Sequence, residues 1–345
     1  MQKLSNPSLL LLRNEEELLG EKVLVINHSD DGFLPELTSI NSASQIYAFS
    51  YNFADHLAAS KHQNVTSFVG HSLPSIDNLD LIIYYYPKSK PEANMMLSNI
   101  RASLGKTTRL LVVGENKGGV KSVEKQLKPY AHASYKLDSA KHCILYEFNE
   151  LIEEEHFDIA DYHQIFNVKV AAQSFEAVSV PGVFNHGKLD AGTELLLNNL
   201  SIPHNGNVLD FGCGAGLIAT FMLNERPNLS LFCLDVSALA LYASEQTLKM
   251  NGHAGHFILS DGLGQVTEKF DAIVSNPPFH TGLNTDYSIA ETFLANAKHM
   301  MKKGASLQIV ANSFLKYPPI IEQHFKHFKT DTKNTKFAVY QAQTV

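Results

Sequence analysis

Short apolar segments recur along the chain, separated by longer stretches in which apolar and polar residues mix. Segments of this kind, rich in valine, isoleucine and leucine, are typical of strands that are buried on both faces of a sheet. The stretches between them are long enough to form helices. Strands that alternate with helices predict parallel sheets with right-handed crossover connections, and therefore an α/β fold.

The apolar segments of the first half return in the same order in the second half. The matching segments are residues 21–27 and 206–212, 79–87 and 270–278, 109–116 and 306–312, and 141–146 and 335–340. A chain of 345 residues is long enough for two domains. We therefore predict two tandem doubly wound (Rossmann-like) domains, residues 1–155 and residues 156–345, with the boundary in an acidic cluster at 150–161.

A glycine-rich motif follows the first apolar segment of the second half. Asn207–Phe211 leads into Gly212, Gly214 and Gly216, and a helical stretch begins at Leu217. Glycine tolerates positive φ and lets a ligand approach the backbone, while a helix N-terminus favours polar or negative groups. The G-x-G-x-G spacing differs from the G-x-G-x-x-G of dinucleotide-binding proteins. It therefore weakens the alternative of a nicotinamide dehydrogenase.

Acidic residues follow the next two apolar segments. Asp235 comes directly after Leu231–Leu234. An acidic residue about 20 positions after such glycines is where a ribose diol is held. Asp261 follows a third segment, within Ser260-Asp261-Gly262. Both carboxylates are also consistent with solvated positions at the ends of strands.

The segment Phe270–Ser275 ends in Asn276-Pro277-Pro278-Phe279. Two consecutive prolines make a stiff turn. Such a turn can hold the Asn276 amide oxygen and the Pro277 carbonyl as two converging acceptors for an exocyclic amino group, which leaves the lone pair of its nitrogen free. Phe279 offers a flat face on which a base can stack. An ordinary turn at the end of a strand is the alternative interpretation, but the glycine motif and Asp235 upstream favour function.

These three motifs, in this order, resemble class I S-adenosylmethionine-dependent methyltransferases that modify amino groups. The resemblance implies S-adenosyl-L-methionine as the cofactor, with Asp235 on its ribose hydroxyls and Asp261 at its adenine amine. The residues expected around the remainder of the cofactor are Asp210, Gly212, Gly214, Gly216 and Asn276. The resemblance also makes Asn276, Pro277 and Phe279 the catalytic residues, with Phe279 stacked on the substrate.

Five segments resemble the ribosomal RNA small subunit methyltransferase C family, and the resemblance covers nearly the whole chain. The segments are residues 86–93, 112–120, 181–184, 208–216 and 276–280. The resemblance implies a degenerate first methyltransferase-like domain and a catalytic second one. It also implies methylation at N2 of one guanosine of 16S rRNA, at position 1207, within the small ribosomal subunit, by a cytoplasmic monomer.

The charge distribution bears on the partner. The formal net charge is −7, yet residues 86–128 and 298–336 are each net basic. Such segments suit contact with a polyanion, although solvated helix faces give the same pattern. Lys88 and Lys90 lie in the first segment, and we predict a role for them in RNA binding or in supporting the fold.

Composition also limits the function classes. No apolar run is long enough to span a membrane. The three cysteines suit a reducing cytosol and form no metal-binding pattern.

Several alternatives stay open at this point. The Asn-Pro-Pro-Phe turn also serves DNA adenine-N6 and protein glutamine-N5 methyltransferases, since all three acceptors are planar amino groups. An RNA-binding ribosome assembly factor is the alternative without catalysis. Asp190 or Thr193 can cap a leucine-rich helix at 195–200, or line the cofactor pocket together with Phe184. His280 can accept a proton or be a neighbouring polar residue.

Overall fold

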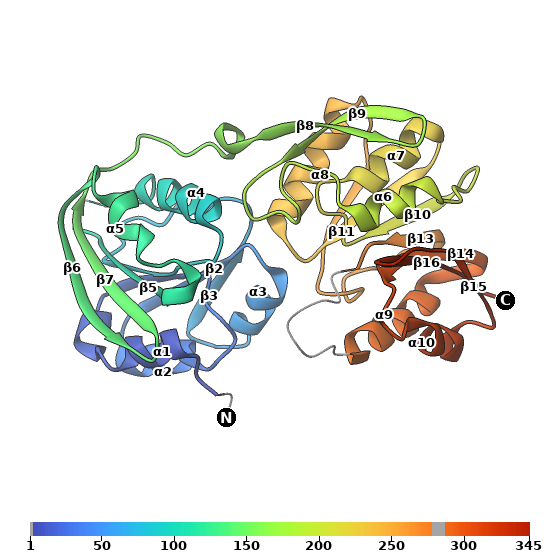
Figure 1. Cartoon of the computed structure of the whole chain (residues 1–345). Helices are drawn as coiled ribbons and strands as arrows, with labels where there is room; N and C mark the ends of the chain where they lie inside the picture. Colours follow the sequence, from blue (N-terminus) through green and yellow to red (C-terminus); the bar gives the residue numbers. More distant parts are fainter. Residues whose placement is uncertain (1–2, 106, 278–286) are drawn as a thin grey trace. The chain divides into compact units, whose positions relative to one another are not determined.

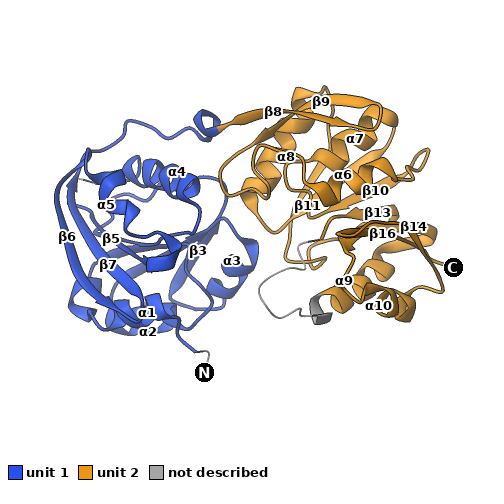
Figure 2. Ribbon diagram, viewed as in Figure 1, with its two compact units in different colours: residues 1–162 blue, residues 163–345 orange. Residues whose placement is uncertain are grey.

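The structure is a computed structural model that describes residues 3–105, 107–277 and 287–345, except for the side chains of 287–289. The chain divides into two compact units, Met1–Tyr162 and His163–Val345 (Figure 2). This division lies slightly beyond the predicted boundary at residue 155. The 3₁₀ helix η3 (Ile159–Tyr162) ends unit 1, and its Ile159 is buried.

Unit 1 contains one seven-stranded sheet in the order β3-β2-β1-β4-β5-β7-β6 (Figure 1). Its strands are β1 (Lys22–Ile26), β2 (Gln45–Ser50), β3 (Val65–Val69), β4 (Leu81–Tyr85), β5 (Arg109–Glu115), β6 (Ala131–Ala140) and β7 (Cys143–Leu151). Its helices are α1 (Asn6–Leu12), η1 (Glu15–Leu18), α2 (Phe33–Ile40), α3 (Phe53–Ala59), α4 (Lys90–Arg101), η2 (Asn116–Gly118) and α5 (Ser122–Leu127).

Unit 2 repeats this sheet in the order β12-β11-β10-β13-β14-β16-β15. Its strands are β8 (Gln164–Val170), β9 (Gln173–Ser179), β10 (Asn207–Phe211), β11 (Ser230–Asp235), β12 (His256–Leu259), β13 (Phe270–Ser275), β14 (Met301–Asn312), β15 (His327–Lys333) and β16 (Phe337–Gln343). Its helices are α6 (Ala191–Asn198), α7 (Leu217–Glu225), α8 (Ala238–Met250), α9 (Tyr287–Met300) and α10 (Tyr317–His324). The strands β8 and β9 form a separate hairpin.

The strand ladders confirm the internal duplication residue by residue. The residues aligned across the three central strands are Val23, Leu81 and Arg109 in unit 1, and Val208, Ala272 and Ser306 in unit 2. These are the pairs expected from the sequence match. The same register places Ser50 of β2 at the position of Asp235 of β11. It also places Tyr85 at the position of Asn276.

The prediction of parallel sheets does not extend to one edge of each sheet, where the last strands pair antiparallel. The strand β7 pairs antiparallel with both β5 and β6, and β16 does so with β14 and β15. In unit 1 the turn between β6 and β7 consists of Lys141 and His142, both with positive φ. A tight turn of this kind can only join antiparallel strands, so β6 and β7 form a hairpin.

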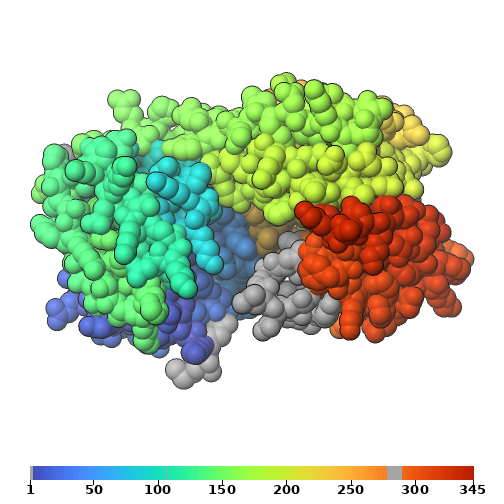
Figure 3. All heavy atoms as spheres, viewed as in Figure 1, coloured from blue at the N-terminus to red at the C-terminus, as the bar shows by residue number. Residues whose placement is uncertain are grey.

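Apolar side chains from the central strands form the cores of the two units. In unit 1 they pack against residues of α1 and α2, and in unit 2 against residues of α9 and α10. The basic segment 86–128 instead reaches the surface of unit 1 through α4 and α5 (blue-green in Figure 3). Lys88 and Lys90 are both exposed there.

Candidate active site of unit 2

The sequence motifs of unit 2 meet at the carboxyl ends of β10, β11, β12 and β13. The first of these strands, β10, lies between β11 and β13. The strands β11 and β12 therefore lie on one side of β10, and β13 and the strands after it lie on the other side. A switch of this kind is where doubly wound sheets bind their ligands. The glycine motif follows β10, Asp235 ends β11, Asp261 follows β12, and Asn276 follows β13.

The three glycines shape the loop between β10 and α7. Gly212, Gly214 and Gly216 have φ of 72°, 53° and 75°, in the left-handed region that other residues rarely adopt. A Cβ atom on Gly214 would have no neighbour within 4 Å. The loop therefore leaves open space beside Gly214, whereas Gly216 packs tightly against Ser244 of α8. This space is the cradle that a cofactor needs.

Asp235 supports the same loop from the end of β11. Its Oδ2 accepts a hydrogen bond from the Gly214 N–H at 3.0 Å, and its Oδ1 accepts one from the Ser237 N–H at 2.9 Å. Burial raises the pKa of this carboxyl, while the backbone donors lower it. The carboxylate thus lies directly beside the glycine loop, as a residue that holds a ribose diol would.

Asp210 lies in β10 beneath the loop and is fully buried. Its Oδ2 accepts a hydrogen bond from the Ala219 N–H at 3.2 Å, and thereby holds the first turn of α7. Its Oδ1 is buried without a hydrogen-bond partner among the described residues. Burial raises the pKa of Asp210 to about 7, the Ala219 N–H opposes this rise, and the charge of Asp235 adds to it. A buried carboxylate oxygen without a donor suits a cationic ligand at this loop.

The Asn276 amide is held in one orientation. Its Nδ2 donates to Asp190 Oδ2 at 3.0 Å and to Thr193 Oγ1 at 2.9 Å. An ionised carboxylate only accepts hydrogen bonds, so the amide nitrogen must face Asp190 and the amide oxygen must point away from it. The neighbouring Pro277 is buried and has no N–H to offer. No donor among the described residues bonds the Asn276 Oδ1, so this arrangement presents an acceptor oxygen at the end of β13.

Asp190 holds this orientation while it also caps a helix. Its Oδ2 accepts from the N–H groups of Gly192 and Thr193 at 2.9 and 3.1 Å, so Asp190 is the N-cap of α6. Of the two predicted caps, Asp190 is therefore the one that forms. The helix spans Ala191–Asn198 and begins earlier than the predicted leucine run.

The contact between Asp190 and Asn276 has no sequence signal, because 86 residues separate the two side chains. A second buried contact was also missed. Ser275 Oγ donates to the Phe211 carbonyl at 2.7 Å and ties the end of β13 to the end of β10.

The remaining predicted site residues fall in three places. Asp261 is exposed, two residues beyond the end of β12. Lys88 and Lys90 belong to unit 1, where Lys88 lines a cavity and Lys90 begins α4. The predictions for Phe279 and His280, like Pro278, lie outside the described residues.

Two further findings limit the chemistry. Among the described residues, no helix combines the length and the apolar character that a membrane span requires. No group of three or more potential metal ligands was found in the described part of the chain.

Comparison with known proteins accounts for the duplicated architecture. The family model described as methyltransferase small domain matches residues 174–341. The family model described as methyltransferase small domain N-terminal matches residues 8–166. The ribosomal RNA small subunit methyltransferase C of Pseudoalteromonas translucida is 57% identical over 342 residues, which cover 99% of this chain and 100% of the relative. This chain belongs to the ribosomal RNA small subunit methyltransferase C family.

Other members of this family extend the match. The Vibrio vulnificus relative is 40% identical over 342 residues and 99% of both chains. A solved structure from T. thermophilus, a 16S rRNA N2 G1207 methyltransferase in complex with AdoMet and guanosine, is 21% identical. The match covers 96% of this chain and 91% of the T. thermophilus chain. The TM-score of 0.80 establishes a common fold. The fold class expected from the sequence, with two Rossmann-like methyltransferase domains, is therefore confirmed.

Proposed function

We propose that this chain transfers a methyl group from S-adenosyl-L-methionine to the exocyclic N2 of a guanosine in 16S rRNA, at position 1207 as in the T. thermophilus protein. Membership of the ribosomal RNA small subunit methyltransferase C family supports the reaction and the RNA substrate. The observation that carries the proposal is the fixed Asn276 amide, because it provides the acceptor that an amino group needs.

The residues of unit 2 divide the work of binding the cofactor. In this proposal the cofactor lies in the open space beside Gly214, Asp235 accepts hydrogen bonds from the ribose hydroxyls, and Asp261 accepts one from the adenine amine; the Asp235 contact with the loop and the exposure of Asp261 support these roles. Asp210 lies behind the loop with one unpartnered oxygen and provides negative charge close to the bound cation. S-adenosyl-L-methionine itself supplies an electrophilic methyl group on a sulfonium leaving group.

Asn276 and Pro277 orient the acceptor. The Asn276 Oδ1 and the Pro277 carbonyl each accept one N–H of the guanine amine, so the nitrogen lone pair points toward the methyl carbon. A carbon–nitrogen bond then forms as the carbon–sulfur bond breaks, and the amine proton leaves to water. No strong base is required, and correct orientation is worth several kcal/mol of the barrier. The target base must leave its helix to reach these acceptors, and Phe279 is proposed to stack on it.

The wider setting is also part of the proposal. We propose that the enzyme acts as a cytoplasmic monomer on the assembled small subunit, with unit 2 catalytic and unit 1 serving RNA binding or support of the fold. The exposed Lys88 and Lys90 support RNA contact by unit 1. Reversing both charges should weaken binding to small subunits and reduce its salt dependence. An unchanged salt slope would remove these lysines from the RNA contact.

The test is methyl transfer from labelled S-adenosyl-L-methionine into naked 16S rRNA, small subunits, duplex DNA and a release factor, measured side by side. We expect label in 16S rRNA or the small subunit, on guanine N2. Label only in DNA adenine or in glutamine would refute the substrate assignment. Asn276→Ala should abolish turnover while the affinity for the cofactor changes only a few-fold. Normal turnover by that variant would refute the acceptor role.

A further inference from the structure

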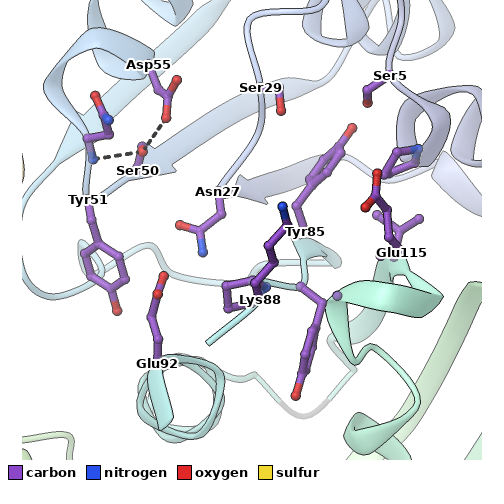
Figure 4. Close-up of a pocket in the computed structure, with 17 residues that line it drawn as sticks. Ser5, Asn27, Ser29, Ser50, Tyr51, Asp55, Tyr85, Lys88, Glu92 and Glu115 are labelled. Atoms are coloured by element: carbon purple, nitrogen blue, oxygen red, sulfur yellow. Dashed lines mark hydrogen bonds between the residues drawn. The ribbon is translucent and has the colours of Figure 1, made fainter. Parts of the chain in front are cut away.

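Unit 1 contains a cavity of about 430 Å³ at the carboxyl ends of β1, β2, β4 and β5 (Figure 4). By strand register, this is the position that corresponds to the candidate site of unit 2. Asn27 lies where Gly212 lies in unit 2, and its φ of 57° keeps the same left-handed turn. The cavity volume is within the range of small-molecule sites, roughly 300–1,000 Å³.

The cavity differs from a methyltransferase site at the two helix N-termini beside it. The Asp31 Oδ2 accepts from the Ser5 N–H at 2.9 Å and from Ser8 Oγ at 2.7 Å, at the start of α1. Its Oδ1 accepts from the Phe33 N–H at 3.1 Å, at the start of α2. A carboxylate of the protein therefore already accepts from donors at both helix N-termini, where a ligand carboxylate would compete with it. This arrangement disfavours S-adenosylmethionine as the ligand of unit 1. The remainder of the cavity is therefore available to a different ligand.

One side of the cavity is acidic. Asp55 Oδ2 accepts a hydrogen bond from Ser50 Oγ at 3.1 Å, and Glu92 points from α4 into the cavity (Figure 4). Burial raises the pKa of both carboxyls. Neither carboxylate belongs to an ion pair among the described residues, and the Glu92 side chain has no hydrogen bond there. Glu92 is thus a partly exposed acceptor in the cavity, and no donor among the described residues bonds its carboxylate.

The rest of the lining includes aromatic rings, an amide, a cation and a further carboxylate, the exposed Glu115. The tyrosines Tyr51, Tyr85 and Tyr86 line the cavity, and the Asn27 amide points into it. Lys88 extends into the cavity from the turn after β4 but stays exposed at its rim. Aromatic faces suit a planar ring, an amide suits a polar edge, and an exposed lysine suits a phosphate.

We infer that this cavity of unit 1 binds one guanine nucleotide, with the base inside against Glu92 and the phosphate at Lys88. Guanine is the base whose Watson–Crick edge presents two adjacent donors, N1–H and N2–H, which match the two oxygens of one carboxylate. Adenine and cytosine place an acceptor beside their amino group, and uracil places carbonyls on both sides of its N–H. A carboxylate therefore selects guanine among the four bases.

The nucleotide can be free in solution or an unpaired residue of RNA, and the chemistry of the site is the same for both. Binding in unit 1 does not require methyl transfer in unit 2, so the inference and the proposed function can fail separately. Guanosine 5′-monophosphate and a short single-stranded RNA with one guanine are the two probes. Tighter binding of the RNA would identify RNA as the source, and equal binding would identify the free nucleotide.

The experiment is calorimetric titration of the full chain with guanosine, adenosine, cytidine and uridine 5′-monophosphates. Glu92→Gln should lower the affinity for guanosine monophosphate about tenfold or more, because the amide has one acceptor oxygen and cannot accept from both N–H groups of guanine. The matched control is Glu36→Gln, which removes an exposed carboxylate from α2 of the same unit. Asn276→Ala should leave the binding of guanosine monophosphate to the cavity of unit 1 intact, because it alters only the candidate site of unit 2.

A second variant guards against a folding defect in Glu92→Gln. Lys88→Ala changes an exposed side chain and should weaken guanosine monophosphate binding while binding of guanosine weakens less. Lys125→Ala, at an exposed position of α5, is its control. The inference is overturned if the wild-type chain binds the four nucleotides equally or not at all. It is also overturned if Asn276→Ala abolishes the binding and Glu92→Gln does not.

Discussion

Replacing Asp190 by serine separates the two tasks of this side chain. Serine caps helix N-termini about as well as aspartate. The chain itself uses serine in this way, since Ser5 caps α1 through its bond from the Ser8 N–H. A serine at position 190 is too short to reach Asn276 and carries no charge. The variant therefore keeps the cap of α6 and loses the acceptor that holds the Asn276 Nδ2.

The expected loss follows from the type of bond that disappears. A hydrogen bond to a charged group contributes about 1.5–3 kcal/mol. If this energy holds the Asn276 oxygen in its reactive orientation, kcat/KM should fall by about tenfold to 150-fold. Asp190→Asn should lie between wild type and Asp190→Ser, because its amide oxygen can still accept from Asn276 without the charge.

The assay measures initial rates of methyl transfer into 16S rRNA, together with cofactor affinity by calorimetry and the midpoint of thermal unfolding. The rate should fall, while cofactor affinity stays within a few-fold and the midpoint barely moves. Glu194→Gln is the matched control, because it removes one exposed charge from the same first turn of α6. A wild-type rate for Asp190→Ser would refute the claim that Asp190 orients Asn276.

Three further predictions concern the glycine loop. Gly216→Ala should lower the free energy of unfolding by about 2 kcal/mol or more, because φ is +75° and the new Cβ would lie 2.6 Å from Ser244 Oγ; an unchanged denaturation midpoint would contradict this. Asp210 has a raised pKa of about 7, so the stability it contributes is complete below pH 4 and is lost as the pH rises to 7. Asp210→Asn should not show this loss of stability, which amounts to at most about 4 kcal/mol and is measured by urea unfolding across that pH range. Parallel profiles of stability against pH for the variant and the wild type would contradict this prediction. Asp235→Ala should weaken cofactor binding about tenfold or more in calorimetry, and unchanged affinity would remove Asp235 from the ribose site.

The duplicated fold was predictable because buried parallel strands have a strong local signature. Runs such as Leu81–Tyr85 and Phe270–Ser275 are apolar throughout, and their spacing repeats between the halves. The direction of the last strands was not predictable from apolar pattern alone, because β7 and β16 contain apolar runs like those of the parallel strands. Their direction depends on short turns, and the positive φ of Lys141 and His142 leaves no strong mark in the residue types.

The candidate site was predictable where backbone conformation requires particular residues. All three glycines of the motif adopt positive φ, which few other residues tolerate. The support around Asn276 was not predictable, because Asp190 reaches it from a distant segment that is adjacent only in the folded unit. The role of Asp31 was hidden for a similar reason, since its partners Ser5 and Ser8 belong to another helix.

The equivalent contacts in the two units explain why only unit 2 is expected to transfer a methyl group. Asn276 of unit 2 bonds Thr193 at the start of α6, and at the equivalent position Tyr85 bonds Ser8 at the start of α1, at 2.8 Å. The Asn276 amide donates through Nδ2 and has a separate acceptor oxygen, Oδ1, whereas the Tyr85 phenol has one oxygen that serves as both donor and acceptor. At this turn, unit 1 therefore keeps the scaffold but carries a phenol in place of the side-chain amide that offers an acceptor oxygen in unit 2. For this reason no methyl transfer from unit 1 should remain when Asn276 is replaced.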